Sequence, residues 1–194
     1  MKPIKTLEST TLVLPESSID TDQIIPARFL TTTERSGLGR AAFADWRFDE
    51  AGAERADCVL NSAAARSAEV LVGGDNFGCG SSREHAVWAL MDFGVRAVVS
   101  CRLADIFRAN ALKNGLLAIE VDTDTHRWLL EHPGARVTLD VSAGTLTTET
   151  GPECSFALDP FARNCLLEGV DALGWLLART PEIEAWETQR REAA

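Results

Sequence analysis

The sequence predicts an α/β fold built as a single domain over residues 1–194. Short apolar segments of strand length alternate with segments of helical periodicity, and this alternation is typical of an α/β core. No internal repeat or low-complexity linker divides the chain. With 45% hydrophobic and 25% charged residues, 194 residues are enough to bury a sizeable core. A helical segment over about residues 160–194 is expected to follow this core.

Five apolar segments bounded by turn formers predict the first strands of the chain. A helix is expected after each of the last three of these strands. These strands are expected at 11–14, 57–60, 69–72, 96–100 and 116–121. The helix over 82–92 carries Ala86, Leu90 and Phe93 at helical spacing and is expected to end at Gly94. The helix over 105–114 is expected to end at Gly115 in the same way.

The second half of the chain predicts a hairpin and then helices. The hairpin joins 136–141 to 145–150 through a turn at 142–144, and a further strand is expected at 155–158. Helices are expected at 161–167, 172–178 and 183–191, with Pro181 at a helix start.

Residues 30–46 differ from the rest, because 31–39 contain turn formers and show no period. We expect a mobile loop there, which is either a binding lid or plain surface disorder.

The most informative motif is the segment Gly74 to Arg83, GDNFGCGSSR, between an expected strand and an expected helix. It places two hydroxyls and a guanidinium at a helix N-terminus, where free amides and the helix dipole attract carboxylate or phosphate. Its glycines let a ligand approach the backbone. The motif therefore predicts an anion site. The alternative is a capping box, in which Ser81 and Glu84 only satisfy the helix start.

Two familiar phosphate-binding motifs are excluded. Cys79 and Gly80 stand where a P-loop needs Lys followed by Ser or Thr, so no ammonium is available for the phosphates. Arg83 stands where the dinucleotide-binding motif needs a small residue for close packing of helix on strand.

Composition limits the partners of the chain. Its net charge of −10, from 29 acidic and 19 basic residues, argues against a nucleic-acid surface and an anionic membrane. The five cysteines form no C-x-x-C pair, and Asp20, Asp22 and Asp75 lack loop-type ligand spacing, so no metal is expected in this chain. Without a signal peptide or an apolar run of membrane-spanning length, a cytoplasmic location is expected.

Residues 75–90, DNFGCGSSREHAVWAL, resemble the signature of the aconitase superfamily swivelling domain. The resemblance is closest to the family of small subunits of bacterial 3-isopropylmalate dehydratase. Residues 20–30, 104–110 and 159–169 resemble further segments of that family, so the likeness runs from about residue 12 to about residue 187. The one departure in the signature is Val87, where these small subunits commonly carry Pro. The resemblance implies an aconitase-type swivelling β/β/α domain with C-terminal helices.

The resemblance also implies a reaction and a partner. The reaction is isomerisation of 2-isopropylmalate to 3-isopropylmalate through 2-isopropylmaleate, a hydro-lyase activity of leucine biosynthesis. The partner is a large subunit that forms a heterodimer with this chain and carries a [4Fe-4S] cluster, whose open iron position acts on the substrate hydroxyl. The cysteines of this chain are not clustered, so no cofactor is expected in it.

By the family pattern, Ser81 is expected to be the general base, acting as an alkoxide. Ser82 is expected to donate a hydrogen bond to the dicarboxylate substrate, and Arg83 to clamp a carboxylate with two hydrogen bonds. A serine hydroxyl is too weak an acid to ionise at neutral pH, so the helix start, the loop amides and Arg83 must stabilise the oxyanion. Glu84 is expected to be a cap or an ion-pair partner, and His85 to be packed or hydrogen-bonded.

Arg35 is the expected second carboxylate contact, because it lies in the loop that covers the substrate in this family. Arg28 is the alternative, since its position also suits a structural ion pair with Asp20 or Asp22.

Two other functions stay open. The chain is alternatively the small subunit of a related hydro-lyase of citraconate or homoaconitate type, because the loop over 30–39 and the partner choose the substrate side group. It is otherwise a non-catalytic module that binds anions and assists assembly. Two hydroxyls beside Arg83 argue against that module, which has no chemical need for them.

Overall fold

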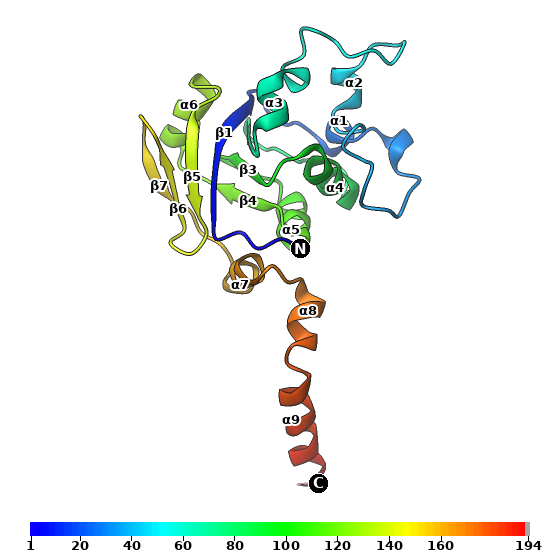
Figure 1. The fold of residues 1–194 in the computed structure, drawn as a ribbon, viewed down its shortest axis with the longest axis vertical. Coiled ribbons are helices and arrows are strands. Elements are labelled where there is room, and N and C mark those ends of the chain that lie inside the picture. Colours follow the sequence, from blue (N-terminus) through cyan, green and yellow to red (C-terminus); the bar gives the residue numbers. More distant parts are fainter. Residues whose placement is uncertain (193–194) are drawn as a thin grey trace.

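The computed structural model describes residues 1–192 and confirms the α/β fold. Within those residues seven strands form one curled sheet in the order β4-β3-β2-β1-β5-β6-β7 (Figure 1). The strands are β1 (Thr6–Leu14), β2 (Val70–Gly73), β3 (Ala97–Ser100), β4 (Leu117–Glu120), β5 (Arg136–Asp140), β6 (Thr145–Thr148) and β7 (Glu153–Ser155).

The α-helices within residues 1–192 are α1 (Thr21–Ile24), α2 (Ala44–Arg47), α3 (Ala63–Ser67), α4 (Glu84–Phe93), α5 (Asp105–Asn114), α6 (Thr123–Glu131), α7 (Pro160–Glu168), α8 (Ala172–Leu177) and α9 (Thr180–Glu192). Two short 3-10 helices, Ala27–Phe29 and Val59–Asn61, complete the elements of this region. The expected stops at Gly94 and Gly115 are confirmed, because both residues end their helices in the left-handed conformation.

Strand β1 joins the two halves of the sheet. Its residues 11–14 pair in parallel with β2, and its residues 6–10 pair antiparallel with β5. The parallel strands β2 and β3 are buried along their whole length, as expected for strands covered on both faces.

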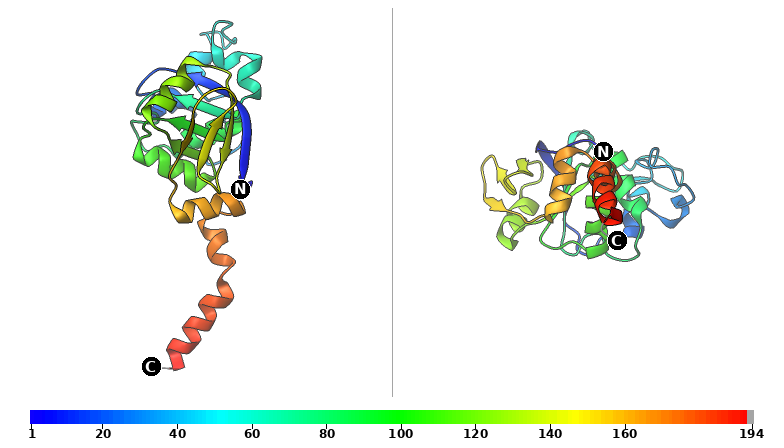
Figure 2. Two further views of the ribbon diagram at one scale, coloured as in Figure 1. Left: turned by 90° about the vertical axis from the view of Figure 1, so that its left-hand side faces the viewer. Right: turned by 90° about the horizontal axis from the view of Figure 1, so that it is seen from below.

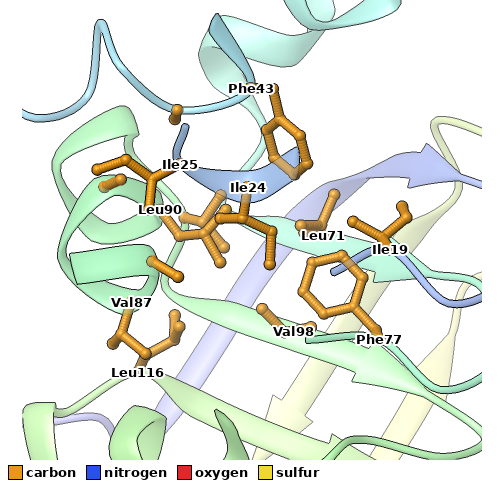
Figure 3. Packing of buried hydrophobic residues seen from close by; sticks show 14 of the residues in the cluster. Ile19, Ile24, Ile25, Phe43, Leu71, Phe77, Val87, Leu90, Val98 and Leu116 are labelled. Atoms are coloured by element: carbon orange, nitrogen blue, oxygen red, sulfur yellow. The ribbon is translucent and has the colours of Figure 1, made fainter. Parts of the chain in front are cut away.

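Alternation along each parallel strand divides the core into two layers. Leu71 and Val98 face a cluster that also contains residues of α1, α4 and α5, and Figure 3 shows them beside Ile24, Val87 and Leu90. Their strand neighbours face the opposite cluster, which receives residues of α6, α7, β5 and β6. The first layer therefore holds α1 and α4 against the carboxyl end of β2, from which the segment Gly74 to Arg83 leaves the sheet.

Several expected elements differ in the structure. The strand expected at 11–14 begins at Thr6, and the loop expected over 30–46 is wrong in its last part, where residues 41–43 are buried and α2 begins at Ala44. Residues 57–60 contain a 3-10 turn in place of a strand, because only Leu60 is anchored in the core and Val59 is 48% exposed. The strand expected at 155–158 lies earlier, since the register with β6 ends at Ser155. The helix expected from residue 82 begins at Glu84, after an extended Arg83.

The C-terminal helices are confirmed in type and extend away from the body of the molecule. Figures 1 and 2 show α8 and α9 as an arm that leaves the sheet beyond α7. The large apolar side chains of this arm are exposed, namely Leu173, Leu176, Leu177, Ile183 and Trp186.

Candidate active site

The motif loop leaves the carboxyl end of β2 and is anchored by Phe77, which is completely buried. The Phe77 ring packs edge-on against Phe107 of α5 with ring centres 5.3 Å apart. Gly78 has a φ of +78°, and a Cβ atom there would lie 2.3 Å from Phe107 Cγ. Only glycine therefore fits beside this aromatic pair, and the loop follows a fixed path to α4.

A second segment, residues 18–22, runs alongside the motif loop. The Gly78 amide donates to the Ile19 carbonyl at 2.8 Å, and the Thr21 amide donates to the Cys79 carbonyl at 2.9 Å. The Thr21 hydroxyl then donates to the Ser81 carbonyl at 2.8 Å. This row of hydrogen bonds holds the loop on the N-terminal side of α1.

Ser81 and Ser82 are exposed at the end of this loop, and Arg83 directly precedes the first turn of α4. The alternative reading of Ser81 and Glu84 as a capping box is wrong, because Arg83 occupies the N-cap position of α4 and no side chain of the described residues caps this helix. The Glu84 carboxylate instead accepts a hydrogen bond from Asn114 at 2.7 Å.

Because no described side chain caps α4, backbone N–H groups at its start are left as free hydrogen-bond donors. Over residues 1–192, the backbone amides of Ser82, Arg83 and Glu84 have no acceptor in the protein. Together with the hydroxyls of Ser81 and Ser82 they form a set of donors at the positive end of α4, which suits an anion.

Arg83 carries the nearest positive charge to this set. Its side chain is 17% exposed, and it forms an ion pair with Asp22 of α1. A guanidinium has five N–H donors, so the Asp22 contact leaves donors for a ligand carboxylate while it limits the orientation of the fork.

Arg28 and Arg35 occupy different surroundings. Arg28 forms an ion pair with Asp45 at 2.5 Å and not with Asp20 or Asp22, as sequence suggested. The Asp20 carboxylate is used in the capping box that starts α1, and Asp22 binds Arg83. Arg35 forms no ion pair within residues 1–192 and lies 5.4 Å above the Trp88 ring of α4.

The loop that precedes α2, over residues 30–43, is attached to α4. The His85 ring binds the Thr32 carbonyl at 2.8 Å, and the Gly39 amide donates to Asp92 at 2.6 Å. The hydrogen-bonded role expected for His85 is thereby confirmed. The loop passes beside α4, which begins just after the serines, so Arg35 lies on the same side of the molecule as α4.

Glu84 is confirmed as an ion-pair partner, with Lys113 Nζ at 3.5 Å from its carboxylate. The hydrogen bond from Asn114, together with Lys113, holds the pKa of Glu84 below its ordinary value. Asn114 also accepts a hydrogen bond from the Trp88 indole at 3.0 Å. This network ties the first turn of α4 to the end of α5.

The cysteines do not gather into a metal centre. Cys79 in the motif loop donates a weak hydrogen bond to the Ser18 carbonyl at 3.3 Å, and burial raises the pKa of its thiol. In the part of the chain that the structure describes, no group of three or more His, Cys, Asp or Glu side chains is arranged to hold a metal ion. In the same region no helix has the length and apolarity needed to span a bilayer.

Sequence reasoning missed the contributions of Thr21 and Asp22 to this site. Thr21 lies 60 positions before Ser81 and Asp22 lies 61 before Arg83, and the sequence suggested Asp22 only as a metal ligand or as a partner of Arg28. A signal was nevertheless present, because an acidic side chain in a second segment of the family pattern is a natural partner for Arg83.

The curled sheet with a Ser-Ser-Arg loop at the start of α4 defines an aconitase-type swivelling domain. The family model described as the aconitase C-terminal domain matches residues 1–124.

Comparison with known proteins shows which family of swivelling domains this chain resembles. The 3-isopropylmalate dehydratase small subunit of Anaeromyxobacter dehalogenans is 58% identical over 98% of this chain and 100% of the relative. That of Roseiflexus castenholzii is 47% identical over 97% of this chain and 94% of the relative. A solved 3-isopropylmalate dehydratase structure from Methanocaldococcus jannaschii superposes with a TM-score of 0.69 at 26% identity, covering 94% of this chain and 99% of that one. This chain belongs to the family of 3-isopropylmalate dehydratase small subunits, which are components of hydro-lyases.

Proposed function

We propose that this chain is one half of a heterodimeric 3-isopropylmalate dehydratase in leucine biosynthesis. The enzyme interconverts 2-isopropylmalate and 3-isopropylmalate through 2-isopropylmaleate. Family membership supports the reaction, and one structural observation carries the assignment of the site. That observation is the uncapped start of α4, where exposed Ser81 and Ser82 stand beside Arg83.

Removal of water needs a base for a proton on the carbon next to a carboxylate, and Ser81 is proposed for that role. Its alkoxide is stabilised by unpaired amides and by the dipole of α4. Arg83 binds a substrate carboxylate, with its fork oriented by Asp22, and Ser82 donates a further hydrogen bond. Arg35, which forms no ion pair within residues 1–192, is proposed as the second carboxylate contact, and Arg28, which is paired with Asp45, is the alternative.

The leaving hydroxyl needs a Lewis acid, which a [4Fe-4S] cluster in the large subunit would supply. The residues of this chain do not fit such a cluster. Its five cysteines lie in separate parts of the fold, at Cys58, Cys79, Cys101, Cys154 and Cys165. The proposed division therefore leaves proton transfer and carboxylate binding to this chain.

The C-terminal arm supports assembly with a larger partner. A helix of 13 residues such as α9 is only marginally stable alone in water, and its Ile183 and Trp186 are exposed. We propose that the large subunit covers this arm. A chain ending at Val170 is expected to keep the thermal transition of the body and to lose co-elution with the large subunit. Undiminished co-elution would refute this part of the proposal.

The decisive experiment mixes the chain with a cluster-loaded large subunit under anaerobic conditions and follows hydration of 2-isopropylmaleate. Ser81→Ala is expected to lower turnover by roughly 10²- to 10⁴-fold, the range for a positioned general base, at unchanged melting temperature. Ser67→Ala, an exposed serine of α3, is the matched control and is expected to behave like wild type. Near-normal turnover of Ser81→Ala would contradict the base assignment.

The same assay separates the other functions. Higher activity on citraconate or homoaconitate than on 2-isopropylmaleate would indicate a related hydro-lyase, and assembly without turnover would indicate a non-catalytic module. The isolated chain is expected to contain no iron and to be inactive. Stoichiometric iron or full activity without a partner would overturn the two-subunit division.

A further inference from the structure

The Ser81 carbonyl is held by a side chain from a distant part of the sequence. Thr21 is 2% exposed, and its hydroxyl donates to the Ser81 oxygen at 2.8 Å. The amide of the same residue donates to the Cys79 carbonyl at 2.9 Å. Thr21 therefore binds the motif loop at the carbonyls of the two residues that flank Gly80, whose φ is +87°.

This contact fixes the direction of a peptide group. The bond between Ser81 and Ser82 is trans, as are all peptide bonds in residues 1–192, so its C=O and N–H point in opposite directions. Because the C=O points to Thr21, the Ser82 N–H points away from α1. That N–H has no acceptor in the protein over the same residues, as expected for an amide at an uncapped helix start.

The free N–H lies next to the proposed base in the chain. An alkoxide on Ser81 needs donors in a fixed orientation, because donors that must turn during the reaction stabilise the charge less. Packing against Phe107 fixes the loop at Gly78, but the peptide group that follows Gly80 and Ser81 needs a contact of its own. The buried hydroxyl of Thr21 supplies it from α1, which is itself held by the Asp20 capping box.

We propose that Thr21 is a positioning residue for the reaction: its hydroxyl holds the Ser81–Ser82 peptide so that the Ser82 amide faces the Ser81 oxyanion and the substrate. This inference rests on the proposed function, because it gives Ser81 the role of base. Thr21 itself touches no substrate and acts only through the peptide that it orients.

The test uses the assembled heterodimer and compares Thr21→Val with Thr21→Ser. Valine keeps the branched shape and removes the donor, whereas serine keeps the donor. Thr21→Val is expected to lower kcat by about 10- to 100-fold, less than the loss of a whole oxyanion donor, with KM changed by less than about twofold. Thr21→Ser is expected to recover most of the rate.

The pH profile distinguishes positioning from stability. A less stabilised Ser81 oxyanion requires a higher pH to form, so the acid limb of kcat is expected to move upward in Thr21→Val and to return in Thr21→Ser. The Asp22–Arg83 ion pair beside this turn is present in both variants, so its charges do not cause the shift.

Thr125→Val is the matched control. Thr125 is 3% exposed and donates its hydroxyl to Asp122 in α6, outside the motif loop. Thr125→Val is expected to lower the melting temperature by about as much as Thr21→Val does, and to leave kcat and the pH profile unchanged.

Three results would settle the inference. If Thr21→Val only lowers the melting temperature, as Thr125→Val does, the positioning role is refuted while the proposed function stands. If Ser81→Ala retains turnover, the base assignment on which this inference rests fails, and if wild-type heterodimer shows no turnover, the proposed function itself fails. If Thr21→Val does not assemble, the smaller Thr21→Ala gives the same comparison, and a wild-type kcat and pH profile in that variant would equally refute the role.

Discussion

Replacing Asn114 with alanine is expected to destabilise the fold by about 2–4 kcal/mol. The Asn114 side chain donates to the Glu84 carboxylate at 2.7 Å and to the Asn110 carbonyl at 2.9 Å, and it accepts from the Trp88 indole at 3.0 Å. A bond to a charged group contributes about 1.5–3 kcal/mol and each neutral bond about 0.5–1.5. The sum is reduced because Glu84, with 28% of its side chain exposed, regains water when its partner is removed.

The sign of the pH dependence provides a second measurement. The hydrogen bond lowers the pKa of Glu84, so its contribution to stability is present above the unfolded pKa of about 4.3 and is lost as pH falls through the lower folded value. The difference between wild type and Asn114→Ala is therefore expected to shrink in acid.

Urea denaturation at neutral pH and at about pH 3.5 measures both effects. Lys113→Ala is the control, because Lys113 pairs with the same carboxylate but is 64% exposed and should contribute less than about 0.5 kcal/mol. An equal loss in the two variants, or a difference that is constant with pH, would refute the reasoning.

Two further predictions concern the motif loop and its arginines. Gly78→Ala is expected to cost more than about 2 kcal/mol of folding free energy in thermal melts, because of its positive φ and the clash with Phe107, whereas Gly134→Ala, with a φ of +85° and open space around it, should cost about 1–2. Arg83→Lys is expected to lower kcat/KM by at least about 100-fold in the assembled enzyme, because an ammonium cannot form two parallel bonds to a carboxylate. Arg35→Lys is expected to raise KM for the dicarboxylate, and unchanged kinetics in Arg35→Lys would exclude it as the second contact.

The parallel part of the sheet was predictable from sequence because its strands are buried on both faces. Such strands appear as apolar runs, and the helices between them end at glycines that take left-handed conformations. The first half of β1 was missed. Residues 6–10 mix polar and apolar side chains, and their partner β5 follows about 130 residues later, so no local pattern reports the pairing.

The site shows how a tertiary contact overrides a local motif. Ser81 and Glu84 have the spacing of a capping box, yet Asn114, 30 residues from Glu84, binds its carboxylate. The chain bends away from the helix at Arg83, and the first amides remain unpaired. The residue types of the anion site were therefore predictable from the motif, but the reason that Ser81 is not used as a cap was not.

The small positive charge of the proposed site explains why this chain is expected to depend on the large subunit for substrate affinity. A dicarboxylate brings two negative charges to a chain whose net charge is −10. Arg83 is the cation beside the serines, and Asp22 offsets its charge while orienting its fork. The amides of α4 add only a fraction of a positive charge. Arg35, above Trp88, supplies a second full charge only if the loop brings it to the substrate. On the proposed function, this chain orients the reacting groups, and most of the attraction for the anion is expected to come from the large subunit.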